Sequence, residues 1–103
     1  MGDYWTAAIG GMRVSVRLSR DSEGRPVDLH ASMGPPGSSL ALAVEAVTTA
    51  ASINLRAGVP MQAITRKWAG QRFDPAGPTG DPSAPQCTSV VDYLARAITA
   101  REQ

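Results

Sequence analysis

The residues best suited to chemistry in this sequence are those that bind anions. Gly37 is followed by two serines and then by an apolar run typical of a helix, and the free N–H groups at the start of a helix attract phosphate. Arginine adds bidentate, charge-assisted hydrogen bonds to phosphate, and an aromatic ring can stack on a base. The predicted ligand-binding residues are Ser38, Ser39, Arg17, Arg72, Phe73 and Thr79.

Each of these residues also has a purely structural interpretation. The serines can simply cap the helix, which is what serine most often does at this position. Arg13 and Arg17 lie on one predicted strand face, and they can form a solvated surface balanced by Asp28. Phe73 can be a buried anchor that holds down a long loop. The sequence leaves both interpretations open.

No catalytic site is predicted. The sequence has one histidine and one cysteine, with no paired spacing of metal ligands, so we expect no metal and no cofactor. His30 lies on the polar face of a predicted strand beside Asp28, where a solvated histidine is expected. Cys87 precedes a predicted helix start that could lower its pKa, but a small, partly buried residue is the preferred interpretation. We therefore expect a protein that is not an enzyme.

An antiparallel β-meander of about three strands is predicted over residues 3–33. Apolar residues alternate with polar ones from Met12 to Ser19 and again from Val27 to Met33, which is typical of half-buried strands. Gly10-Gly11 suits a tight hairpin turn, and residues 21–24 suit a second turn. The two prolines at 35 and 36 end the sheet.

Three helices are predicted to follow, which gives an α+β fold in one domain, residues 1–103. The first, residues 38–57, carries apolar residues and alanines around most of its circumference, so we expect burial on several sides, either within the chain or against a second subunit. A short helix is predicted over 60–69 with Pro60 at its first position. Residues 70–88 are predicted to be a loop. The last helix, 89–101, is predicted to begin with Ser89 as its cap and Asp92 returning the hydrogen bond.

Composition indicates which classes of partner to expect. Ten basic and nine acidic residues give a net charge of +1, which predicts neither a nucleic acid polymer nor a membrane as partner. The single cysteine cannot form an internal disulfide, and the N-terminus lacks the apolar run of a signal peptide, so a cytoplasmic location is expected. The alanine-rich helix predicts a homo-oligomer, either a dimer or a higher even number of subunits.

The loop and the helix after it carry a more specific pattern. The segments concerned are Val59-Pro60-Met61, Lys67-Trp68, Arg72-Phe73-Asp74-Pro75-Ala76-Gly77-Pro78-Thr79-Gly80-Asp81-Pro82 and Ser89-Val90-Val91-Asp92-Tyr93. Together with Gly24-Arg25-Pro26 and Gly37-Ser38-Ser39 they resemble the TSCPD-type C-terminal domain of adenosylcobalamin-dependent (class II) ribonucleotide reductases. The resemblance covers about residues 10–98. The chain lacks the catalytic barrel, the pentapeptide that names the domain and the reductant cysteine pairs, so no catalytic residue carries over.

The resemblance implies a connection with nucleotides and leaves two functions open. The first is a non-catalytic protein that binds a nucleotide-like small molecule, such as a phage protein that sequesters cyclic nucleotide or ADP-ribose-type immune signals in the host cytoplasm. The second is an accessory or regulatory module of a class II ribonucleotide reductase, which would be its partner. The residues themselves do not decide between these functions.

Overall fold

The computed structural model describes residues 2–102, and its fold class is α+β, as the sequence predicted. Three strands form an antiparallel sheet in the order β1 (Gly2–Ile9), β2 (Met12–Arg20) and β3 (Pro26–Met33). Gly10 and Gly11 form the turn between β1 and β2 with φ angles of 58° and 80°, a conformation that glycine adopts without strain. Pro75 packs so closely on Gly10 that a side chain at that position would collide with it.

The alternation of residue types gives the sheet one buried and one open face. The register pairs Trp5 with Val16 and Val16 with Ala31, so these residues share the inner face. The fully buried side chains of this face belong to Ile9, Val14, Val16, Leu18, Leu29, Ala31 and Met33. Tyr4, Arg17 and His30 are aligned across the three strands on the outer face.

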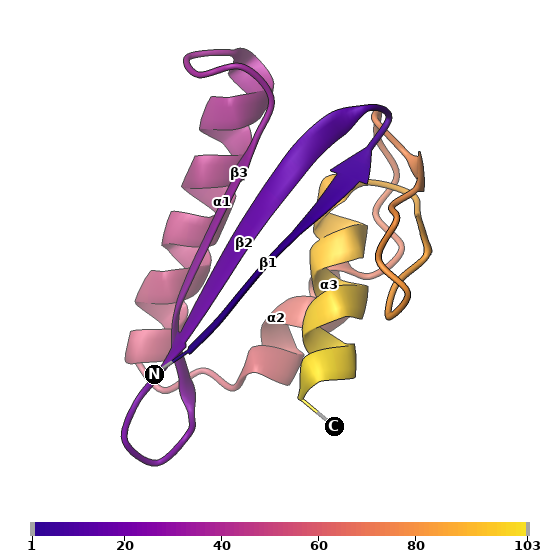
Figure 1. Ribbon diagram of the computed structural model, residues 1–103. Coiled ribbons are helices and arrows are strands. Elements are labelled where there is room, and N and C mark those ends of the chain that lie inside the picture. The colour runs from indigo at the N-terminus through magenta and orange to yellow at the C-terminus, as the bar shows by residue number, and fades with distance from the viewer. Residues whose placement is uncertain (1, 103) are drawn as a thin grey trace.

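The helix α1 (Ser39–Arg56) lies along β3 (Figure 1). Ser52 on this helix accepts a hydrogen bond from the backbone N–H of Leu29 and donates one to its carbonyl oxygen, both at 2.9 Å. The helix therefore occupies the outer edge of β3 and satisfies backbone groups that would otherwise be open to another strand. Only one side of α1 is buried by the chain itself, because Leu42 and Ile53 are 56% and 65% exposed.

Two shorter helices complete the fold. They are α2 (Met61–Trp68) and α3 (Val90–Arg101), and they pack against each other. Pro60 was predicted to be the first helical residue of α2. It is instead the N-cap, in an extended conformation. The segment predicted as a loop contains two very short paired strands, β4 (Gly77–Pro78) and β5 (Gln86–Cys87).

The hydrophobic core lies between the inner face of the sheet and the helices. Val44 and Leu55 of α1 and Tyr93, Leu94 and Ile98 of α3 join the same buried cluster as the strand residues. The start of β1 and the end of α3 lie at the same end of the molecule. The turn between β1 and β2 and the loop between α2 and α3 lie at the other end (Figure 1). Within residues 2–102, no helix combines the length and the apolar character needed to cross a membrane.

Candidate functional site

The two serines predicted to bind an anion lie at the start of α1. The Oγ atom of Ser38 accepts a hydrogen bond from the backbone N–H of Ala41 at 3.1 Å, so Ser38 is the helix cap. Ser39 is the first residue of the helix and is exposed. Capping accounts for Ser38, while the hydroxyl of Ser39 faces solvent.

The remaining predicted residues lie in different places. Arg17 is exposed on the outer face of the sheet, and Arg72 is exposed in the loop after α2. Its neighbour Phe73 is 44% exposed, so the interpretation of Phe73 as a buried anchor is wrong. Thr79 is 1% exposed, and its hydroxyl donates to the carbonyl of Ala84 at 2.6 Å. Thr79 is thus an internal residue of the loop.

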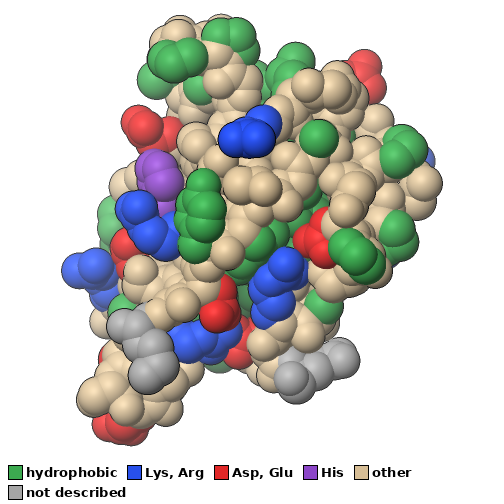
Figure 2. All heavy atoms as spheres, in the orientation of Figure 1, with side chains coloured by type: hydrophobic (Ala, Val, Ile, Leu, Met, Phe, Trp, Pro, Cys, Tyr) green, Lys and Arg blue, Asp and Glu red, His purple; other side chains and the backbone are tan. Residues whose placement is uncertain are grey.

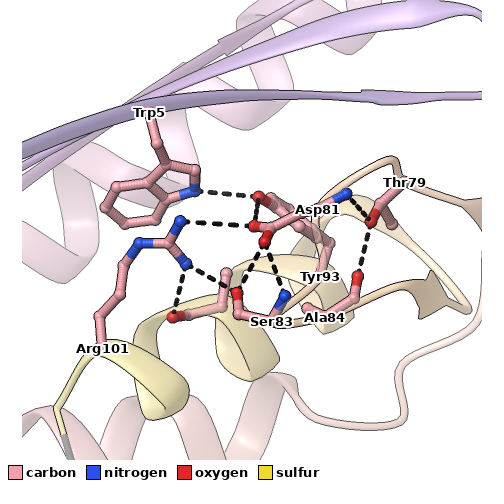
Figure 3. A network of polar contacts seen from close by, with 8 residues as sticks. Trp5, Thr79, Asp81, Ser83, Ala84, Tyr93 and Arg101 are labelled. Carbon is pink, nitrogen blue, oxygen red and sulfur yellow. Dashed lines mark hydrogen bonds and ion pairs between the residues drawn. The ribbon is translucent and has the colours of Figure 1, made fainter.

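A polar network that the sequence analysis missed fixes this loop to the rest of the molecule (Figure 3). The Tyr93 hydroxyl on α3 donates to the Asp81 carboxylate at 2.6 Å and accepts from the indole N–H of Trp5, on β1, at 2.9 Å. Ser83 donates from both its backbone N–H and its hydroxyl to the same carboxylate. The guanidinium of Arg101 lies 3.9 Å from the centre of the Trp5 ring and 3.5 Å from Asp81.

The network stabilises the ionised form of Asp81. Burial alone would raise the pKa of this carboxyl, but hydrogen bonds from Tyr93 and Ser83 and the positive charge of Arg101 outweigh burial and lower the pKa. Burial, followed by the hydrogen bond to Asp81, raises the pKa of Tyr93 above its ordinary value. Tyr93 therefore remains a protonated donor and Asp81 a charged acceptor at neutral pH.

Asp92 forms a second anchor at the base of the loop. Its carboxylate accepts from the backbone N–H of Gly70 at 2.7 Å and of Thr88 at 2.9 Å, and it forms an ion pair with Arg96 at 2.9 Å. Burial would raise the pKa of Asp92, but these donors outweigh it and lower the pKa. The predicted capping box is thus half correct: Ser89 caps α3 by accepting from the Asp92 N–H, but the Asp92 side chain bonds to Thr88 and Gly70 instead of returning to Ser89.

These anchors explain the residue pattern that carried the family resemblance. Thr79, Asp92 and Tyr93 are part of that pattern, and all three are buried with their polar atoms bonded inside the chain. Asp81 belongs to the same segment as Thr79, directly after Gly80. These three residues of the pattern therefore hold the loop in place. The sequence pointed to the residues but did not predict their contacts.

The two residues considered for catalysis lie apart in the fold. His30 lies on the outer face of the sheet, whereas Cys87 lies in β5. Cys87 is buried, and burial raises the pKa of its thiol, so the structural interpretation of this cysteine holds. Among residues 2–102, no three His, Cys, Asp or Glu side chains are grouped so that they could hold a metal ion.

The outer face of the sheet is the remaining exposed polar surface. Arg17 lies between Tyr4 and His30 in the register, and Tyr4 is 67% exposed. Figure 2 shows basic side chains around the single histidine on this face. In the part of the chain that the structure describes, neither Arg13 nor Arg17 takes part in an ion pair.

Comparison with known proteins assigns the chain to a family. The TSCPD domain family matches residues 1–101, so the chain belongs to that family, as the resemblance implied. Similar proteins are the vitamin B12-dependent ribonucleotide reductases, in whose C-terminal region the matching segment lies. The reductase of Streptomyces avermitilis is 39% identical over 66 residues, which are 64% of this chain and 7% of that protein.

Two further relatives extend the match. The reductase of Rhodopirellula baltica is 36% identical over 74 residues, which are 72% of this chain and 7% of that protein. That of Bradyrhizobium diazoefficiens is 31% identical over 93 residues, which are 89% of this chain and 7% of that protein. The chain thus spans about 7% of the length of these relatives. No solved structure matches significantly.

Proposed function

We propose that this chain is a non-catalytic module that works with a B12-dependent ribonucleotide reductase. The observation that carries the proposal is the TSCPD match over residues 1–101, together with relatives in which such a segment is the C-terminal region of a reductase. A domain that occupies about 7% of those proteins is expected to bind the rest of the reductase chain and to affect its activity. The expected location is the cytoplasm.

The side chains support a role without chemistry of its own. The buried Asp81, Tyr93 and Asp92 use their polar atoms to hold the loop, and the Cys87 thiol is kept protonated by burial. Because these groups stabilise the fold, we propose that the domain acts by binding a partner through its surface.

A binding measurement tests this function. The probe is the Bradyrhizobium diazoefficiens reductase from which the matched segment has been removed, immobilised for biolayer interferometry with this chain in solution. The proposal predicts saturable binding with micromolar or stronger affinity, about 8 kcal/mol of binding free energy or more. An absence of binding at 100-fold higher concentrations, on the order of 0.1 mM, contradicts the proposal.

Nucleotide binding is a second candidate, favoured by the row of Tyr4, Arg17 and His30 on the outer face of the sheet, in which Arg17 is exposed and His30 is half-buried. Arg17 supplies a guanidinium for a phosphate and Tyr4 an exposed ring for a base. A protein with this property would sequester cyclic nucleotide or ADP-ribose-type signals, as a phage-encoded protein would do in a host cell.

Calorimetry tests the second candidate. The panel consists of cyclic oligonucleotides, cyclic ADP-ribose isomers and deoxynucleotides. Arg17→Ala tests the row on the sheet, and Arg72→Ala and Ser39→Ala, which lie elsewhere, are the controls. Loss of an arginine–phosphate contact is expected to weaken binding by about 1.5–3 kcal/mol, or one to two decades. If every panel member binds more weakly than about 1 mM, sequestration is excluded and the reductase module remains.

A further inference from the structure

A cleft of about 780 Å³ opens at the end of the molecule where the chain begins and ends. Its floor is apolar and belongs to the core, because Leu55, Met61 and Ile98 line it and are at most 6% exposed. The linker residues Val59 and Pro60 form part of its wall, as does the turn between β2 and β3. An apolar side chain that entered the cleft would exclude water from core surface that is now accessible.

Both arginines that line the cleft are paired with acidic residues of the domain. Arg25 pairs with Asp21 at 3.1 Å, and Arg56 pairs with Asp28 at 3.5 Å. Glu102, the last described residue on the rim, pairs with Arg20 at 3.0 Å. Because Arg25 and Arg56 are both engaged, neither is available to a phosphate, and the buried apolar floor is suited to an uncharged, apolar group.

Arg20 also fixes where the chain enters and leaves the domain. Its guanidinium contacts Asp3, near the start of β1, at 3.3 Å and Glu102, just after α3, at 3.0 Å. Asp21, the next residue, lines the cleft, as does Glu102. In a protein where a longer chain precedes this domain, the preceding segment would therefore join it at the end of the molecule that holds the cleft.

From this geometry we propose that the cleft is the docking site for the reductase segment that directly precedes the domain in B12-dependent ribonucleotide reductases, with an apolar side chain of that segment as its anchor. The inference rests on the proposed function. The tether delivers this segment to the rim at high effective concentration, and the apolar floor supplies the binding free energy. When the domain is a separate chain, the same cleft takes the same segment from a second protein.

The experiment uses the truncated Bradyrhizobium diazoefficiens reductase described above and two variants of this chain. Val59→Glu places a charge in the half-buried wall, and Thr99→Tyr fills the cleft from an exposed position on α3. Met12→Glu is the matched control, because Met12 is 37% exposed at the start of β2, outside the cleft. Circular dichroism verifies that each variant is folded. A synthetic peptide of the preceding segment is added as competitor, with a scrambled peptide beside it.

The inference predicts that both cleft variants bind the truncated reductase at least about tenfold more weakly, that Met12→Glu binds like the original chain, and that only the true peptide competes. If the original chain binds and both folded cleft variants bind within about twofold of it, the cleft inference is overturned while the proposed function stands. Weakened variants with no competition by the peptide overturn the choice of segment. If the original chain does not bind at all, the proposed function fails and the inference with it.

Discussion

At the scale of single residues, Tyr93 is a side chain whose polar contacts connect distant parts of the chain. Its hydroxyl joins Trp5 on β1 to Asp81 in the loop before α3. Tyr93→Phe removes both bonds and leaves the Asp81 carboxylate and the Trp5 N–H without this partner. We expect the free energy of unfolding to fall by about 1.5–3 kcal/mol, measured by urea denaturation.

Tyr4→Phe is the matched control, because Tyr4 is 67% exposed and the same hydroxyl is removed there. Its free energy of unfolding is expected to stay within about 0.5 kcal/mol of the original value. Equal effects of the two substitutions would show that the network contributes nothing to stability.

Acid sensitivity also belongs to the residue scale. Asp81 and Asp92 have pKa values lowered in the folded state, because hydrogen-bond donors and nearby arginines outweigh their burial. An unfolded chain titrates its aspartates near about pH 3.9, so it takes up protons there before the folded state does. The stabilisation is therefore complete above about pH 4–5 and is lost as the pH falls through the lower folded-state pKa values.

Denaturation curves recorded from about pH 7 to pH 2.5 measure this loss. Asp92→Asn is expected to be less stable at neutral pH and to lose less stability on acidification, because one of the two responsible carboxyls is gone. A variant whose stability declines with acid as steeply as that of the original chain would contradict the assignment to Asp92.

At the scale of elements, the contact between α1 and β3 depends on Ser52. Its hydroxyl bonds to the N–H and the carbonyl of Leu29 and to the carbonyl of Thr48, all at 2.9 Å. Ser52→Ala leaves the buried N–H of Leu29 without this acceptor, and we expect a loss of about 1–3 kcal/mol in unfolding free energy. Ser32→Ala, at an exposed position of β3, is the control and should change little. Similar losses of unfolding free energy for both substitutions would show that the hydrogen bonds of Ser52 do not stabilise the contact between α1 and β3.

The exposed apolar side of α1 is where we predict that a homo-oligomer forms. Leu42 and Ile53 are exposed near its two ends, and Ala46 and Ala50 are exposed between them. In an antiparallel pair of such helices, the large residue at one end meets the large residue at the other, as a twofold interface requires. Light scattering is expected to give at least twice the chain mass of 10.8 kDa, and Ile53→Glu is expected to shift the protein toward monomer. A monomer at micromolar concentration contradicts the prediction.

The elements show what a sequence can and cannot predict. The alternation around Val14 and Val16 identified the strands because a sheet with one open face imposes a period of two. The docking of Ser52 on Leu29 left no such period, since it joins residues 23 positions apart in sequence. The short strands β4 and β5 were missed for the same reason. Thr79 was predicted to face a ligand because a threonine in a loop rich in glycine and proline gives no sign that it is buried.

At the scale of the whole molecule, the family relation and the position of the chain ends lead to one account. The loop of this TSCPD domain is held by internal bonds, and Arg20 links the start of β1 to the residue that follows α3. We propose that this domain takes the place of the corresponding region in a B12-dependent reductase. A reductase that already carries that region should then have its site occupied.

The most direct test compares the binding of this chain to the intact Bradyrhizobium diazoefficiens reductase and to the same reductase without the matched segment, by analytical ultracentrifugation with labelled chain. The account predicts that the chain sediments with the truncated reductase in equal molar amounts and remains free in the presence of the intact enzyme. Equal binding to both forms, or to neither, would contradict it.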